Sequence, residues 1–397
     1  RATALSAGVT ALAFAGAVTL APLVPVPASL RGPDGEPIQM TDVSLQLKRE
    51  IQRGANTPAF DYATDDGEGA YLRLYSLPTF NADGWHLVNS NVQLGALPQP
   101  PGLAGGATRR TTVTITGFAS EWLPAPYAPT ATSAGADWGY LPDSLAILAL
   151  GVTSRTKATQ GLTYTVTSRQ ATLTGSQQWS AAQGATPPDA AVTASVPSDI
   201  SPRLVKLAQE LTAGAPTAGA KVARIAAYLA RPEFTYSLDA QPGSGYTGLE
   251  DFLLRDHKGF CVQYAASLAI LARIAGVPTR VAIGFTPGRR AGDHFTVTMH
   301  DMHAWPEFYL AGLGWVMYEA TPGVAGAGGT GQPDPTASPS ASPTPEPSQG
   351  ASGSAAPAGS GTATATAAAL ADSDLPVPAD FEEEAAKSIS ASNYKGE

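Results

Sequence analysis

The sequence contains a single cysteine, Cys261, and its surroundings place it at the start of a helix. Small and apolar residues recur at helical spacing after it, and Gly276 and Pro278 supply a stop signal. The unpaired N–H groups at a helix N-terminus and the positive end of the helix dipole favour an anion. They therefore favour the thiolate, which is the nucleophilic form of cysteine. The alternative is a small buried hydrophobic residue.

A thiolate nucleophile works with a base that takes its proton and a third group that orients the base. Residues 302–310 have an extended pattern, residues 311–314 form a turn, and residues 315–320 have the pattern of a returning strand. Such a hairpin brings His303 and Glu319 onto neighbouring strands near the same end, although a bulge would change which side chains face each other. We predict His303 as the base and Glu319 as the orienting acid.

Several neighbouring polar residues have alternative interpretations. Asp301 lies two residues before His303 and is a rival to Glu319 as the orienting acid. His294 and His300, together with His303, do not have the spacing of a familiar ligand set, so we predict no metal site. Glu307 is expected to be a structural partner of a backbone group or of an arginine such as Arg280, and not a catalytic acid.

Four segments resemble, in this order, the bacterial transglutaminase-like superfamily: residues 259–265, 271–285, 303–309 and 314–322. The resemblance extends to its membrane-anchored branch, in which a transglutaminase-like domain lies outside the cell between transmembrane segments. It implies a papain-like fold and a triad of Cys261, His303 and Glu319. The acid of this family is commonly aspartate, so Glu319 departs from the family pattern.

The resemblance implies cysteine-dependent acyl transfer on a protein or peptide substrate at the cell surface. A thioester on Cys261 would be resolved by an amine, which crosslinks glutamine, or by water, which deamidates it. This chemistry needs no cofactor. One alternative is a cysteine peptidase or amidohydrolase using the same triad, and another is a binding or scaffold module without turnover. The sequence does not decide the substrate, the acceptor or the oligomeric state.

Composition excludes some partners and crosslinks. The 397 residues carry a formal charge of −9 and no basic stripe, which argues against a nucleic-acid partner. A single cysteine excludes a disulfide within the chain. Residues 2–23 are uncharged and long enough to cross a bilayer, so we expect a membrane anchor followed by an extracytoplasmic domain. A cleaved signal peptide and a buried helix are the alternatives for this segment.

The predicted fold class is α+β: helices packed on an antiparallel sheet, as in a papain-like core, preceded by a β-rich domain. Within the core, Ser201 and Thr217 are expected to begin helices, and residues 279–285 to form a strand. The predicted domain boundaries are as follows: 1–28 transmembrane helix, 29–175 β-rich domain, 176–200 linker, 201–323 catalytic domain, 324–378 disordered linker rich in Ala, Gly, Ser and Pro, and 379–397 acidic C-terminal segment, beyond which the resemblance implies a second membrane helix.

Overall fold

The structure, a computed structural model, describes residues 47–324 except residues 50, 53–55, 89–91, 151–156, 172, 174 and 242. The predicted membrane segment, residues 2–23, lies outside these residues, as does nearly all of the predicted spacer and acidic end, residues 324–397. Within the described part of the chain, no helix is both long enough and apolar enough to span a membrane.

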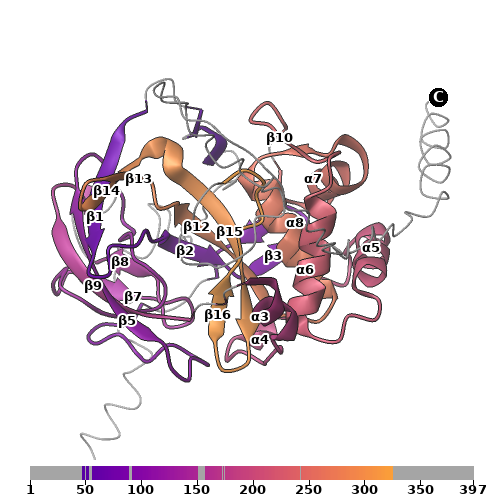
Figure 1. The fold of residues 1–397 in the computed structure, drawn as a ribbon, viewed down its shortest axis with the longest axis horizontal. Coiled ribbons are helices and arrows are strands. Elements are labelled where there is room, and N and C mark those ends of the chain that lie inside the picture. The colour runs from indigo at the N-terminus through magenta and orange to yellow at the C-terminus, as the bar shows by residue number, and fades with distance from the viewer. Residues whose placement is uncertain are drawn as a thin grey trace, which may run out of the picture. The chain divides into compact units, whose positions relative to one another are not determined.

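Strands dominate the first part of the described chain, and helices come before the last strands (Figure 1). The upstream strands are β1 Pro58–Thr64, β2 Leu72–Leu77, β3 Thr79–Asn81, β4 Gly84–His86, β5 Ala107–Ile115, β6 Pro129–Thr132, β7 Trp138–Tyr140, β8 Ile147–Ala149 and β9 Thr163–Gln170. The helices are α3 Gly175–Ala181, α4 Ala190–Thr193, α5 Pro202–Thr212, α6 Ala218–Leu229, α7 Tyr246–Asp251 and α8 Cys261–Ile274, with a π-helical turn over Phe252–Asp256. The remaining strands are β10 Thr235–Tyr236, β11 Lys258–Gly259, β12 Thr279–Phe285, β13 Arg289–Ala291, β14 His294–Thr298, β15 Met302–Leu310 and β16 Gly314–Met317, with a 3-10 turn at Met299–Asp301.

The smaller of the two main sheets carries the predicted base, His303. Its strand order is β16-β15-β12-β2, and all neighbours are antiparallel. Strands β12, β15 and β16 come from the predicted catalytic region, whereas β2 comes from the β-rich region upstream. All seven residues of β12 are buried, because β12 has a strand on each side and α8 packs against it.

The larger sheet has the strand order β13-β14-β1-β5-β9-β6, again with antiparallel neighbours. In this sheet two downstream strands join the upstream ones, because β14 pairs with β1 and β13 pairs with β14. Residues 289–291 form the edge strand β13. An edge strand faces solvent and so tolerates the two arginines of this segment. Both main sheets therefore combine strands from the two ends of the described chain.

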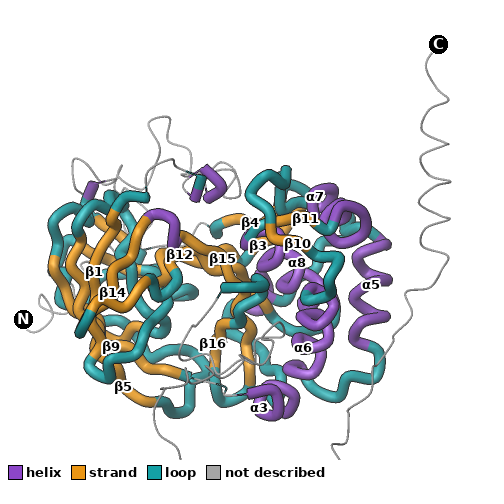
Figure 2. The backbone as a smooth tube through the Cα atoms, turned by 45° about the horizontal axis from the view of Figure 1, so that its top comes forward, coloured by secondary structure: helices purple, strands orange, loops and turns teal. Residues whose placement is uncertain are grey.

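The helices gather on one side of the smaller sheet (Figure 2). Helix α5 begins where Ser201 accepts a hydrogen bond from the Arg203 N–H, and α6 begins where Thr217 accepts one from the Ala220 N–H. Side-chain oxygens at these positions satisfy N–H groups that have no partner within the helix. Both predicted helix starts are confirmed, and so is the predicted class of helices on an antiparallel sheet with a β-rich region.

Helix α8 is buried on all sides, and only Ile274 among its residues is not fully buried. It packs against β12 and β15 on one side and against α5 and α6 on others. Small residues at 265, 266, 267, 269 and 272 let these neighbours approach closely. The helix is thus a rigid central element that fixes the position of its first residue, Cys261.

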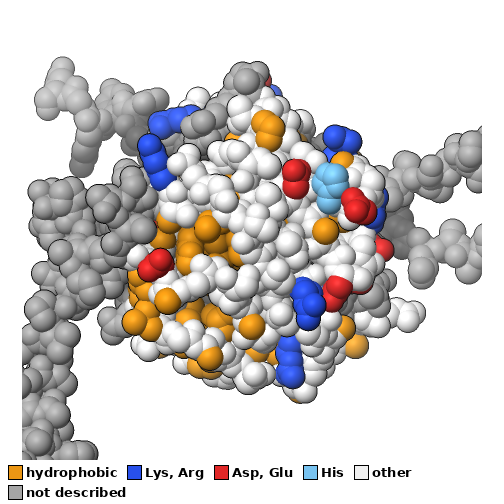
Figure 3. Space-filling view, turned by 90° about the vertical axis from the view of Figure 1, so that its left-hand side faces the viewer, with side chains coloured by type: hydrophobic (Ala, Val, Ile, Leu, Met, Phe, Trp, Pro, Cys, Tyr) orange, Lys and Arg blue, Asp and Glu red, His pale blue; other side chains and the backbone are white. Residues whose placement is uncertain are grey.

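Figure 3 shows the face of the molecule on the β-rich side. Acidic and basic side chains are interspersed there, and hydrophobic side chains gather in one area between them. Most large aromatic residues of this region are internal, including Trp85, Trp122 and Trp138, which are all buried.

Candidate active site

Cys261 is the first residue of α8 and follows an extended N-cap residue, Phe260. The Gln263 side chain accepts a hydrogen bond from the Phe260 N–H at 3.1 Å, which fixes the entry into the helix. A side chain at Gly259 would place its Cβ 2.8 Å from the ring of Phe252 and 2.9 Å from Gln263. A glycine is therefore required two residues before Cys261 for the chain to enter the helix this closely.

His303 lies on β15 and Glu319 lies just beyond the end of β16. The hairpin brings their side chains together, with His303 Nε2 2.9 Å from Glu319 Oε2. The Thr321 N–H donates to the other carboxylate oxygen at 2.7 Å. Both side chains are largely shielded from water, with relative exposures of 5% for His303 and 10% for Glu319.

His303 also interacts with Cys261. Burial, the largest effect, lowers the pKa of His303, but attraction to the Glu319 carboxylate and hydrogen bonds to Cys261 and Glu319 outweigh it and raise the pKa to about 10. One imidazole therefore interacts with the carboxylate, through Nε2, and with the thiol. The imidazole thus lies between the thiol and the carboxylate, which is the order in which a nucleophile, a base and an orienting acid act.

Glu319 carries its charge in a buried setting. Burial raises the pKa of this carboxyl group, but the attraction of His303 and the hydrogen bonds from His303, Thr321 and Tyr71 together lower it below its ordinary value. The Tyr71 hydroxyl donates to Oε2 at 2.7 Å, across a separation of 248 residues. Sequence reasoning missed Tyr71, and no local pattern around it signals this contact.

Asp301, the rival acid, is engaged elsewhere. Its Oδ2 accepts from the Thr298 N–H at 2.7 Å and from the Thr298 hydroxyl at 2.6 Å, which caps the 3-10 turn before β15. His294 lies beside Asp293 at 3.1 Å. In the described ranges, no group of three or more His, Cys, Asp or Glu side chains is arranged to hold a metal ion.

Glu307 is two residues further along the same face of β15 as Trp305. It accepts from Arg280 Nε at 2.6 Å and from Arg73 Nη1 at 3.0 Å, and all three side chains are almost fully buried. Although burial raises the pKa of Glu307, the two guanidinium groups lower it below its usual value. The expectation of a structural partner such as Arg280 is confirmed, and a second arginine from β2 joins it.

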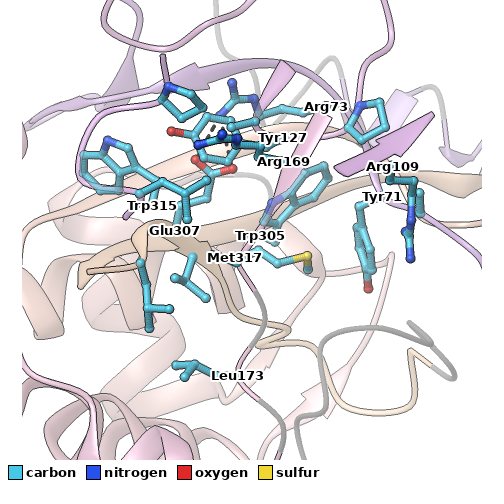
Figure 4. A pocket seen from close by; sticks show the side chains of 18 of the residues that line it. Tyr71, Arg73, Arg109, Tyr127, Arg169, Leu173, Trp305, Glu307, Trp315 and Met317 are labelled. Carbon is cyan, nitrogen blue, oxygen red and sulfur yellow. Dashed lines mark hydrogen bonds and ion pairs between the residues drawn. The ribbon is translucent and has the colours of Figure 1, made fainter. Parts of the chain in front are cut away.

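A small pocket of about 100 Å³ lies next to this ion-pair cluster (Figure 4). Arg73, Tyr127 and Glu307 group at one end, and Tyr71 lies at the other end beyond Trp305. The pocket is therefore linked to the Glu319 acid through Tyr71, which lines the pocket and donates a hydrogen bond to Glu319 Oε2.

Cys261 itself is 0% exposed, so a substrate carbonyl reaches the sulfur only when neighbouring side chains move. Tyr236 is 40% exposed and lies on β10, where it pairs with Gly259 of β11, two residues before Cys261. The Ser237 N–H donates to the Gly259 carbonyl at 2.7 Å and holds this pairing. Burial and the nearby Cys261 and Glu319 raise the pKa of Tyr236, which keeps the phenol neutral at the mouth of the site.

Residues 205–320 match the sequence model of the transglutaminase-like superfamily, and residues 1–175 match that of the TgpA N-terminal domain. We refer to residues 205–320 as the transglutaminase-like domain because of this similarity. Cys261, His303 and Glu319 all fall within the matched residues.

The chain is 36% identical over 126 residues to a protein-glutamine gamma-glutamyltransferase of Pseudomonas aeruginosa PAO1, covering 31% of this chain and 19% of that protein. It is 29% identical over 136 residues to the protein YebA of Bacillus subtilis 168, covering 32% of this chain and 18% of that protein. The chain thus matches less than a fifth of the length of these relatives.

The fold is that of the periplasmic domain of TgpA from Pseudomonas aeruginosa. One crystal structure of that domain aligns with a TM-score of 0.54 and 23% identity, over 69% of this chain and 90% of that one. A second, bound to ethylmercury, aligns with a TM-score of 0.53 over 70% of this chain and 94% of that one. The alignment extends beyond the transglutaminase-like domain, so the β-rich region is part of the shared fold.

Proposed function

We propose that the protein is a cysteine-dependent acyltransferase that acts on glutamine side chains of proteins or peptides. The observation that carries the proposal is the placement of the His303 imidazole between Cys261, at a helix N-terminus, and the buried carboxylate of Glu319. The name of the Pseudomonas aeruginosa relative supports glutamine as the acyl donor.

In the first half-reaction the Cys261 sulfur forms a bond to the carbonyl carbon of the glutamine side chain, while His303 holds the proton that the thiol has given up. N–H groups at the start of α8 are placed to stabilise the oxyanion of the tetrahedral intermediate, a contribution of about 3 kcal/mol. The C–N bond then breaks, His303 gives the proton to the departing ammonia, and a thioester remains on Cys261. Glu319 stabilises the imidazolium throughout.

In the second half-reaction a primary amine attacks the thioester. The new N–C bond forms, the C–S bond breaks, and the amine proton passes through His303 to the sulfur. Water in place of the amine gives glutamate, so the choice between crosslinking and deamidation depends on which acceptor reaches the thioester. No step uses a metal or a cofactor in this proposal.

We further propose that the domain acts outside the cytoplasm on a protein or peptide substrate at the cell surface. The similarity in fold to a periplasmic domain supports this location. The uncharged run of residues 2–23 supports attachment to the membrane. Its test is fractionation of cells that produce the full chain, where recovery from the cytosolic fraction would contradict the proposed location.

The proposed reaction is tested by incubating the full chain with glutamine-containing peptides and a tagged primary amine, followed by mass spectrometry, with Cys261→Ala as the matched control. We expect tagged glutamine that is absent with the variant. Loss of ammonia without the tag would identify a deamidase, and cleavage of the peptide backbone would identify a peptidase. The absence of any product that depends on Cys261 would contradict an enzymatic function.

A further inference from the structure

Tyr71 lies immediately before β2, far upstream of the transglutaminase-like domain. Its hydroxyl donates to Glu319 Oε2 at 2.7 Å, and the same oxygen is 2.9 Å from His303 Nε2. With the Thr321 N–H on Oε1, the carboxylate has a partner for both oxygens. The orientation of the acid is thus set by three donors, of which one comes from the β-rich region.

The position of Tyr71 follows from strand register. Leu72 pairs with Phe285 on β12, and Phe285 pairs with Met302 on β15, the residue before His303. The Tyr71 ring also packs edge-on against Trp305, with centroids 5.1 Å apart. Two strand pairings and one aromatic contact therefore hold the hydroxyl at Glu319. Burial and the Glu319 carboxylate both raise the pKa of Tyr71, so at neutral pH it remains a donor.

A glutamate has one more rotatable bond than an aspartate, so it loses more side-chain entropy when it is fixed beside a histidine. A hydrogen bond to a charged acceptor is among the stronger ones in proteins. The hydrogen bond from Tyr71 restricts rotation about this additional side-chain bond of Glu319, because it holds the same carboxylate oxygen that His303 contacts.

We propose that Tyr71 is a positioning residue of the active site, which holds the long Glu319 side chain against His303, so that the β-rich region completes the triad. This inference rests on the proposed function for the roles of the three residues. The ring of Tyr71 belongs to the core in any case, and the proposal concerns its hydroxyl. Tyr71→Phe removes the hydroxyl and keeps the ring.

The first test is a double-mutant cycle on kcat/KM for glutamine transfer by the full chain, with Tyr71→Phe, Glu319→Asp and the double variant. We expect Tyr71→Phe to lower kcat/KM by about 10- to 100-fold through kcat. An aspartate is too short to reach both partners, so in the Glu319→Asp background the same change should have a much smaller effect. Equal effects in the two backgrounds would overturn the proposal.

Tyr164→Phe is the matched control. Tyr164 is buried in the same region, and its hydroxyl also makes one hydrogen bond of 2.7 Å, to the Pro124 carbonyl. A general loss of packing or stability would appear in both variants, whereas a loss of positioning would appear only with Tyr71→Phe. A loss of activity in Tyr164→Phe equal to that in Tyr71→Phe would contradict the proposal.

The second test does not depend on the acyl-transfer activity. Iodoacetamide alkylates Cys261, and Glu319 holds the His303 side chain that assists this reaction. We expect Tyr71→Phe to be alkylated several-fold more slowly than the wild type at neutral pH, with Tyr164→Phe unchanged. An unchanged or faster rate for Tyr71→Phe would overturn the role of Tyr71. If the protein transfers no acyl group but Tyr71→Phe is alkylated more slowly, the proposed function fails and the positioning role stands.

Discussion

Gly284 on β12 lies directly opposite His303 on β15 in the antiparallel ladder. A Cβ at Gly284 would lie 2.2 Å from the Leu72 carbonyl oxygen and 2.8 Å from the Trp305 ring. The register of β2 against β12 shifts between Ile283 and Gly284, so a side chain at Gly284 would meet the β2 backbone. Leu72, the residue after Tyr71, pairs with Phe285 next to this point.

Gly284→Ala is expected to destabilise the protein by about 3 kcal/mol, because the added methyl group meets backbone atoms that cannot move aside. Urea unfolding followed by circular dichroism measures the change. Gly105→Ala is the control, since a Cβ there has no atom within 4 Å. Equal stability of the two variants would show that the strands separate easily at this position.

Glu307→Gln is expected to cost about 3–5 kcal/mol of unfolding free energy, because it leaves the buried Arg73 and Arg280 without a carboxylate. Thermal and urea unfolding provide the measurement. Asp251→Asn removes the partner of Arg255 in an ion pair at the surface and should cost less than about 1 kcal/mol. A loss for Glu307→Gln as small as that of the control would mean that water reaches the arginines.

The free energy of unfolding should depend on pH through the protonation of His303. Its pKa is raised in the folded protein to about 10 from an ordinary value of 6.5, so the folded state holds this proton more tightly than the unfolded state. The resulting stability is fully present below pH 6.5 and is lost as the pH rises toward 10. We expect the difference in unfolding free energy between the wild type and His303→Gln to shrink over this range. A difference that stays constant from pH 6 to pH 10 would contradict a charged His303.

Tyr236→Ala is expected to increase the rate of Cys261 alkylation at a fixed pH by several-fold. The substitution removes a large side chain close to a thiol that is 0% exposed. Leu94→Ala removes an exposed side chain, 68% accessible, and is the control. Mass spectrometry of the alkylated protein gives both rates. Equal rates for Tyr236→Ala and the wild type would show that another segment limits access to the sulfur.

Local chemistry made much of the fold predictable from the sequence. The starts of α5 and α6 are set by Ser201 and Thr217, whose side chains bond to N–H groups two and three residues away. The strand over 279–285 was predictable because its β-branched and apolar residues fit a buried strand. The position of Cys261 at the start of α8 was also predictable, because the helical pattern and its stop signal lie within one short segment.

Contacts between distant segments were not predictable. The bond from Tyr71 to Glu319 spans 248 residues and depends on the register of three strands, which no local pattern encodes. For the same reason, the sequence does not reveal that β2 joins the sheet of the downstream strands, or that β13 and β14 join the sheet of the upstream strands. The sequence left Glu319 and Asp301 as rivals because hairpin register decides between them, and in the structure Glu319 contacts His303 while Asp301 caps a turn.

The pairing of β2 with β12 also governs when this protein becomes competent during its synthesis. Pairing between segments that lie about 200 residues apart slows folding, because a long loop closes before the contact forms. Tyr71 leaves the ribosome before Cys261, and Cys261 leaves it before Glu319. A nascent chain therefore holds an incomplete site, and the reactive thiol gains its partners only once synthesis has passed Glu319.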